Sequence, residues 1–333
     1  MRPVDTSAPS PYTGRETLLK NRAARSGSFG VHGRTAVMLG ALFLVGAATP
    51  VALNADTILA QRLADWNGAW WLRAHAVTCV AVLGLAMLVH GMRGLRRASV
   101  VAHRRAASAH QPWRWDYEWD ERGARDDDSM RRARQFIVAG IGTFGIGAPI
   151  HWITLEEIGR RAAQIDVAQI IIVWLPLGLG ILLLDLIAML MLAKGGKLIL
   201  RRLKYGPGMA TFARFPFRVG EPLELHVQAP RSLPQHAVVT ATLRCIQERY
   251  VTTETRRGET QTNIQCFELY RDSTPADHVA TGAGTRTLRV RFDLPRDGPV
   301  TDLTSRPCRY WEIDVEASTD GLDYAARFLV PVY

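Results

Sequence analysis

Two ionisable side chains lie inside long apolar runs of the sequence. Asp185 falls within residues 167–192, and His90 falls within residues 76–92. A carboxylate inside a membrane-spanning helix costs about 2.5–3.5 kcal/mol on insertion scales, so it should face the bundle interior, find a partner or be protonated. We predict His90 as the partner of Asp185. The pair is typical either of a proton or ion relay or of a polar clamp that joins two helices.

An aromatic cluster occupies the polar stretch between two of the apolar runs, at residues 93–135. Its members are Trp113, Trp115 and Trp119, with Arg114 among them. Side chains two residues apart share a face only in an extended segment. The cluster predicts a binding surface for a protein partner or a lipid headgroup. The alternative is a loop that the aromatic rings anchor at the membrane interface or pack against a soluble domain.

An acidic run at residues 126–128 follows this cluster. It could bind a divalent cation, but it lacks the glycine and the ligand spacing of a calcium loop. Five arginines surround it and can neutralise it more cheaply than a metal ion can. We therefore predict no metal site here. The arginines are Arg114, Arg122, Arg125, Arg131 and Arg132.

Catalytic signatures are missing from the chain. It has no P-loop, no GxSxG and no HExxH sequence, and no histidine and cysteine at a spacing that suits catalysis. Cys79, Cys245, Cys266 and Cys308 show no CxxC spacing, so we expect small buried side chains rather than a disulfide framework or a zinc site. These observations favour a binding protein without a cofactor over an enzyme.

The net charge of +10 is unevenly distributed. Residues 205–333 hold 15 arginines and no lysine against 16 acidic residues, so this part is nearly neutral. The excess positive charge flanks the apolar runs. That distribution is typical of membrane topology and not of a groove that binds nucleic acid.

Four apolar runs are long enough to cross a bilayer. The hydrocarbon core is about 30 Å thick, and a helix needs about 20 mostly apolar residues to span it. The third run is rich in glycine, at Gly140, Gly142, Gly145 and Gly147, which predicts close helix packing within a bundle. The mean hydropathy of the whole chain, −0.02, conceals these segments. The predicted spans are residues 35–53, 76–92, 136–153 and 167–192.

Lysines and arginines predict the orientation of these spans. The segments 1–34, 93–135 and 194–204 together hold 22 of them, whereas 54–75 and 154–166 together hold four. The positive-inside rule then places both termini in the cytoplasm of a multi-pass inner-membrane protein. The basic flanks should attract anionic lipid headgroups by about 1 kcal/mol per charge near the surface.

From residue 205 onward the apolar period changes from helical to alternating. In residues 287–292, Leu288, Val290 and Phe292 alternate with arginines. Such alternation predicts strands with one buried and one wet face. We expect seven or so short antiparallel strands packed as a β-sandwich. The other predicted strands are residues 210–215, 223–227, 239–245, 263–270, 310–317 and 325–332.

Three stretches of the sequence carry a resemblance to a known group. They are residues 112–119 (PWRWDYEW), residues 204–206 and 220–223 (KYG and GEPL), and residues 310–333, which open with YW and end with FLVPVY. Together they cover roughly the second two-thirds of the chain. The chain resembles bacterial multi-pass inner-membrane proteins with a Pro-Trp-x-Trp loop motif and a C-terminal arrestin-like β-sandwich. Asp116 stands where that motif has arginine, and Glu118 where it has aspartate.

The resemblance implies an architecture and a binding role, and it supplies no activity. Together with the patterns above it predicts an α+β membrane protein. In this prediction, residues 1–34 are a disordered cytoplasmic segment. Residues 35–193 form a four-helix transmembrane domain that contains the cytoplasmic loop 93–135. A basic linker, residues 194–204, leads to an arrestin- or immunoglobulin-like antiparallel sandwich at residues 205–333.

Three functions are compatible with this organisation. The leading hypothesis is a membrane-anchored adaptor whose cytoplasmic sandwich binds a protein partner of unknown identity through its sheet edges or loops. The alternative is a small transporter or channel-like component with Asp185 and His90 in its path. The third is an enzyme with an unfamiliar site that gathers Trp113, Trp115 and acidic residues of the loop.

Overall fold

The computed structural model describes residues 16–19, 22, 24–25, 33–53, 68–126, 128–161, 172, 174–230, 232–254, 260–281 and 285–333. The chain divides into two compact units, and each is described by itself. We call the first the helical unit, which comprises Val31–Ala98 and Arg132–Leu198. We call the second the sheet unit, which comprises Met1–Gly30, Ser99–Arg131 and Ile199–Tyr333.

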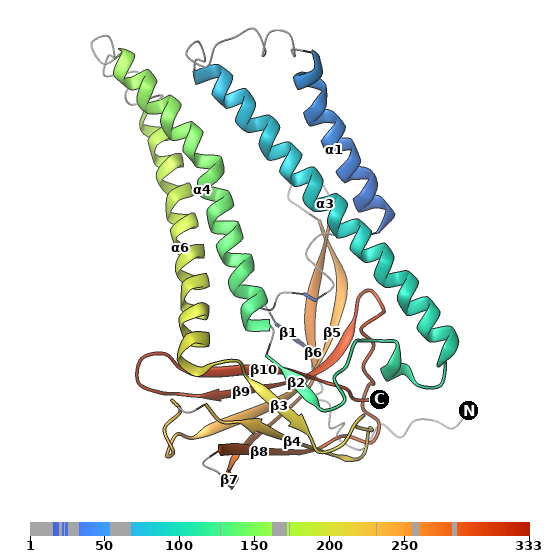
Figure 1. Ribbon diagram of the computed structural model, residues 1–333. Helices are drawn as coiled ribbons and strands as arrows, with labels where there is room; N and C mark the ends of the chain where they lie inside the picture. The colour runs from blue at the N-terminus through green and yellow to red at the C-terminus, as the bar shows by residue number, and fades with distance from the viewer. Residues whose placement is uncertain are drawn as a thin grey trace. The chain divides into compact units, whose positions relative to one another are not determined.

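Four long helices are present (Figure 1): α1 (Arg34–Leu53), α3 (Gly68–Ala107), α4 (Asp128–Arg161) and α6 (Leu175–Tyr205). Three segments are long and apolar enough to cross a membrane: Arg34–Leu53, Ala74–Ala107 and Leu175–Tyr205. The predicted span 136–153 lies in α4, where four of its side chains are outside the described part. The structure therefore supports three candidate spans. Residues 167–171 and 173 of the fourth predicted span also lie outside the description.

Glycines mark the places where these helices touch. A Cβ atom on Gly40 of α1 would lie 2.6 Å from the backbone nitrogen of Leu88 in α3. A Cβ on Gly140 of α4 would lie 2.8 Å from the side chain of Leu192 in α6. Small residues permit such backbone approach in a helix pair.

The prediction of packing glycines in residues 136–153 holds at Gly140 but not at its neighbours. Cβ positions on Gly142 and Gly145 have no atom within 4 Å among the described residues. The α1–α3 contact, which uses Gly40, Gly84 and Gly91, was not predicted. Which glycines of a helix face its neighbour depends on the partner, and composition does not reveal that.

Helix α6 is longer than the predicted span because nothing interrupts it before Gly206. The segment 194–204, predicted as a linker, forms its last turns. Gly206 then adopts φ of +75°, and its N–H donates to the carbonyl of Arg202 at 2.8 Å. A left-handed residue of this kind, which glycine adopts without strain, commonly ends a helix.

The sheet unit contains two five-stranded sheets, and all pairings between their strands are antiparallel. Sheet A has the order β1-β6-β5-β9-β10, and sheet B has the order β2-β3-β4-β8-β7 (Figure 1). The strands of sheet A are β1 (Thr17–Leu18), β5 (Val239–Glu254), β6 (Thr260–Pro275), β9 (Arg309–Ala317) and β10 (Tyr324–Val330). Those of sheet B are β2 (Gly123–Arg125), β3 (Met209–Phe212), β4 (Pro222–Gln228), β7 (Asp277–Thr281) and β8 (Thr285–Asp293).

One hydrophobic core draws on both sheets. Leu243 and Trp311 come from sheet A, and Leu225 and Val290 come from sheet B; all four are 0% exposed. The indole of Trp311 donates to the carbonyl of Pro299 at 2.6 Å, which satisfies its polar atom. Every strand predicted by alternation is present, whereas β1, β2 and β7 were not predicted.

One expectation was wrong. In the predicted strand 310–317, Glu312 and Asp314 alternate with Trp311, Ile313 and Val315, which puts them on its wet face, yet they are 0% and 3% exposed. They are buried on the outer face of sheet A because Arg22 and Arg327 pair with them there. Residues 1–34 were expected to be disordered; most of them lie outside the described residues, and Thr17 and Leu18 form β1 and pair with β6.

Candidate functional site

The segment that carries the tryptophan cluster is built into the sheet unit. Pro112–Arg114 form a short 3-10 turn, in which the N–H of Asp116 donates to the carbonyl of Pro112 at 2.9 Å. Further along, β2 pairs with β3 at the edge of sheet B, with Ala124 opposite Ala210. We call residues 108–122 the tryptophan loop. Its two ends are therefore fixed by α3 and by β2.

Asp116 attaches the tryptophan loop to the far end of the chain. This carboxylate is 2% exposed. It accepts hydrogen bonds from the backbone N–H groups of Leu303 and Thr304, both at 2.7 Å, and from the Tyr333 hydroxyl at 2.9 Å. Because a buried carboxylate is stable only when it is well bonded, these contacts define the position of the loop.

Tyr333 then joins two tryptophans of the loop. Its hydroxyl accepts a hydrogen bond from the indole of Trp119 at 3.0 Å, and its ring centroid lies 6.1 Å from that of Trp113. Burial, and next the negative charge of Asp116, raise the pKa of Tyr333 above its ordinary value. The phenol therefore stays protonated and can donate to Asp116 over the whole physiological range.

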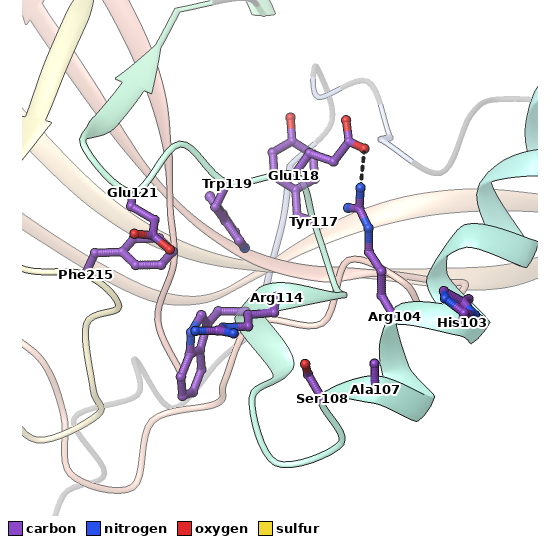
Figure 2. A pocket seen from close by; sticks show the side chains of 11 residues that line it. His103, Arg104, Ala107, Ser108, Arg114, Tyr117, Glu118, Trp119, Glu121 and Phe215 are labelled. Atoms are coloured by element: carbon purple, nitrogen blue, oxygen red, sulfur yellow. Dashed lines mark hydrogen bonds and ion pairs between the residues drawn. The ribbon is translucent and has the colours of Figure 1, made fainter.

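A cavity of about 540 Å³ opens beside this loop (Figure 2). Trp113, Tyr117, Trp119 and Phe215 form its apolar part. Figure 2 shows Arg104, at the end of α3, reaching toward Glu118, and their ion pair is 3.3 Å long. The remaining lining residues are His103, Ala107, Ser108, Arg114 and Glu121.

The cavity combines aromatic walls with charges of both signs. Arg104 and Glu118 pair with each other, while Arg114 and Glu121 are exposed. Aromatic rings and arginine are the side chains most enriched where proteins bind one another. The arrangement can hold an apolar or aromatic group against the rings while the rim bonds polar groups. No nucleophile with an adjacent base is found among its lining residues.

The structure brings together three of the four residues predicted for this loop. Trp113, Arg114 and Trp119 line the cavity. Trp115 does not, and the guanidinium of Arg105 instead lies 5.0 Å from its ring centroid. Its indole nitrogen is buried and has no hydrogen-bond partner within the described chain.

The described carboxylates of the acidic run 126–128 form contacts at the start of α4. The carboxylate of Asp126 accepts bonds from the backbone and the hydroxyl of Ser129, at 3.2 and 2.8 Å, as a helix cap does. Asp128 forms ion pairs with Arg131 and Arg327. Asp127 lies outside the described residues. The part of the chain that the structure describes contains no cluster of potential metal ligands.

The predicted partner of Asp185 was wrong. Nε2 of His151, in α4, lies 3.1 Å from Oδ1 of Asp185 in α6. The predicted topology puts His90 and Asp185 in the same half of the bilayer, but a shared half does not say which helix is the neighbour. His90 is exposed in α3. Asp185 and His151 are partly buried, with side chains 28% and 34% exposed.

Several residues of the site escaped the sequence interpretation. Asp116 and Tyr333 are separated by 217 positions, and Phe215 follows a different strand. No local pattern links such positions. The Asp126-x-x-Ser129 spacing is a detectable signal, because it is a common start of a helix.

Comparisons with known proteins give no family for this chain. No family model matches it, and no curated protein does. Among solved structures, Spo0M, a sporulation control protein from Bacillus subtilis, matches at 13% identity over 38% of this chain, with a TM-score of 0.22. A DUF4466 family protein from Parabacteroides merdae matches at 12% identity over 38% of this chain, with a TM-score of 0.18. The matches span 48% and 43% of those chains, and TM-scores this low carry no conclusion about this protein.

Proposed function

We propose that this protein is a multi-pass protein of the bacterial inner membrane that anchors an arrestin-like β-sandwich on the cytoplasmic side. Three apolar helices and the helical α4 support a four-helix membrane domain. Two antiparallel sheets with one common core support the sandwich. The segments 1–34, 93–135 and 194–204 hold 22 lysines and arginines, whereas 54–75 and 154–166 hold four, and this difference supports cytoplasmic termini. Anionic lipid headgroups would bind the basic helix ends.

Within this architecture the protein acts as a non-enzymatic adaptor. The tryptophan loop binds a partner protein, and the partner inserts an apolar or aromatic side chain into the cavity. The observation that carries this proposal is the aromatic cavity of about 540 Å³, whose walls are held in place by Asp116. A preformed apolar pocket with a polar rim is the usual form of a binding site.

The rim restricts the partner further. Arg114 and Glu121 are exposed and of opposite charge. A partner segment with both an acidic and a basic residue beside its apolar anchor would satisfy both. Charged groups at a rim set orientation and specificity more than affinity.

The test places a photoreactive amino acid at Arg114 in the full-length protein in cells. Val238, which is 78% exposed and outside the cavity, is the matched control position. We expect a discrete crosslinked product from position 114 that disappears when Trp113→Ala is added, and none of the same mass from position 238. Equal products at both positions, or a product at position 114 that survives Trp113→Ala, would count against the cavity as the binding site.

A second candidate function rests on the contact between Asp185 and His151. A carboxylate and an imidazole 3.1 Å apart between two membrane helices could pass a proton. The protein would then be a small transporter or channel-like component, with His151 in the role first predicted for His90. Asp185→Asn should abolish proton uptake by liposomes that contain the purified protein. Absence of uptake with the unaltered protein would remove this candidate.

A further inference from the structure

The outer face of sheet A, which points away from the common core, carries an unusual row of buried charges. Nη1 of Arg244 lies 2.6 Å from Oδ2 of Asp314, and its Nε lies 3.1 Å from Oε2 of Glu268. Arg327 contacts Asp314 at 2.5 Å. Glu312, the fifth charged residue in this row, is 0% exposed. Burial of so many charges requires that each one be paired.

Described residues near the N-terminus of the chain lie on this face, and we call residues 16–19, 22, 24 and 25 the N-terminal segment. Thr17 and Leu18 pair with Glu268 and Phe267 at the outer edge of β6 (Figure 1). The N–H of Leu19 adds a bond of 2.9 Å to the carbonyl of Cys266. This is strand addition to a sheet edge, the mode by which many proteins bind extended peptides.

Side chains of the N-terminal segment contact the sheet at three places. The carboxylate of Glu16 makes two bonds of 2.6 Å with the guanidinium of Arg249. Leu19 and Ala24 pack on the apolar cluster around Ile246. Beyond them, Arg22 forms an ion pair with Glu312 and lies 3.7 Å from Asp314.

The segment also adds positive charge to the face. Sheet A contributes four buried carboxylates and two guanidiniums, and one of those guanidiniums, that of Arg327, also pairs with the buried carboxylate of Asp128. Arg22 and Arg25 therefore offset two of the three excess negative charges. The N–H of Arg25 donates to the carboxylate of Glu248, and its guanidinium lies 5.0 Å from the ring centroid of Tyr310. The carboxylates are Glu248, Glu268, Glu312 and Asp314, and the guanidiniums of the sheet are Arg244 and Arg327.

We propose that the outer face of sheet A is a docking site for an extended, arginine-bearing segment of a protein partner, and that the N-terminal segment occupies it as a built-in substitute. Strand β6 has 16 residues, and within the described chain β1 pairs with only two of them. A partner strand can therefore pair with more of the edge than β1 does. The partner would present leucine opposite Cys266 and arginine three residues later. Tyr117 and Trp119, which line the cavity of the tryptophan loop, pack on the same apolar cluster as Leu19 and Ala24. Arg22 and Glu312 do not line that cavity, so the two proposals are tested at different residues and either can fail alone.

The experiment uses a variant that lacks residues 1–27 and three fluorescent peptides of residues 14–27. One peptide has the native sequence, one carries Arg22→Ala, and one carries Lys20→Ala as a control of equal charge. We expect the native and Lys20→Ala peptides to bind the variant with similar affinity. The Arg22→Ala peptide should bind about tenfold more weakly or worse, because it removes the closer of the two guanidiniums that face Glu312. The unaltered protein should bind the native peptide at least about tenfold more weakly than the variant does, because the peptide must displace the resident segment.

Equal binding of the Arg22→Ala and Lys20→Ala peptides would overturn the proposal. So would an absence of native-peptide binding while circular dichroism shows that the variant retains its β-structure. If the shortened variant does not fold, full-length Arg22→Ala replaces it, and it should bind the native peptide more tightly than the unaltered protein. If millimolar peptide cannot displace the N-terminal segment from the unaltered protein, the outer face of sheet A is permanently closed to a partner. That result would also overturn the proposal.

Discussion

At the scale of single residues, Asp116 has the largest influence on the candidate binding site. It lies near the middle of the tryptophan loop and connects the loop to Leu303, Thr304 and Tyr333. A basic side chain at this position could not accept these three hydrogen bonds, because it has no acceptor atom. The anchoring of the loop described here therefore depends on the aspartate.

Replacement of Asp116 by alanine should release the tryptophan loop. Two backbone N–H groups and one hydroxyl lose their acceptor, and we expect a loss of about 1–3 kcal/mol in the free energy of unfolding. Thermal unfolding in detergent, with limited proteolysis of residues 108–122, measures the effect. Glu121→Ala is the matched control, because Glu121 is exposed in the same loop. Equal stability of the two variants would contradict the anchoring role.

The buried charges of sheet A predict a dependence of stability on pH. Burial raises the pKa of Asp314, but the guanidiniums of Arg327, Arg22 and Arg244 outweigh it and hold the pKa below its ordinary value of 3.8. A carboxyl whose pKa is lower in the folded state contributes stability above its unfolded pKa, and this contribution disappears as the pH falls through the folded pKa. Stability should thus be nearly constant from pH 7 to about pH 5 and decrease below about pH 4.

Asp314→Asn tests the origin of this acid sensitivity. At pH 7 the variant leaves arginines without their buried partner, and we expect a loss of about 3–5 kcal/mol. The difference from the unaltered protein should shrink as the pH falls below about 4, because Asp314 becomes protonated first in the unfolded state and, at still lower pH, in the folded state. Denaturant unfolding at a series of pH values measures this, and Glu316→Gln, exposed on the same strand, is the control. A difference that is the same at all pH values would exclude Asp314 as the source.

At the scale of elements, the contact between α1 and α3 depends on the absence of a side chain at one position. A Cβ on Gly40 would lie 2.6 Å from a backbone nitrogen of α3, whereas a Cβ on Gly46 of the same helix meets no atom within 4 Å of those described. Gly40→Ala should therefore lower the melting temperature of the protein in detergent, with a loss of about 1–3 kcal/mol from overpacking. Gly46→Ala should leave it unchanged or slightly raised, because alanine favours the helix. Equal effects would argue against the α1–α3 contact.

The strands also show which parts of the fold can be predicted from the sequence. Strand β9 shows regular alternation, and Trp311, Ile313 and Val315 lie in the core as predicted. The same alternation misassigned Glu312 and Asp314, because a period of two separates the two faces but does not say what covers each. Strand β1 has two residues and no pattern of its own, so only its partner β6 defines it.

At the scale of the whole molecule, the proposed cytoplasmic position of the sheet unit can be measured in intact cells. Val238→Cys places an exposed thiol on the sheet unit. Cys245, Cys266 and Cys308 of this unit are buried, and burial raises the pKa of Cys266 to about 11, so we expect little background labelling. A membrane-impermeant maleimide should label position 238 only after the cells are opened.

The companion variant is Gln61→Cys, in the predicted outer loop, and it should be labelled in intact cells. The unaltered protein, which retains Cys79, measures the background. Labelling of position 238 in intact cells would place the sheet unit outside the cytoplasm. The proposed cytoplasmic adaptor role would then fail.

The sequence alone determined that the chain has long apolar helices followed by alternating strands. Hydrophobicity and period are sums over neighbouring residues, so they can be read without knowledge of distant partners. Tertiary structure decided which polar groups meet: Asp185 with His151, Asp116 with Tyr333, and Arg22 with Glu312. These partners are up to hundreds of positions apart, and only the packing of helices and sheets makes them neighbours. Because these groups are wholly or partly buried, each contact restricts how the chain can fold, since a charge removed from water needs its partner.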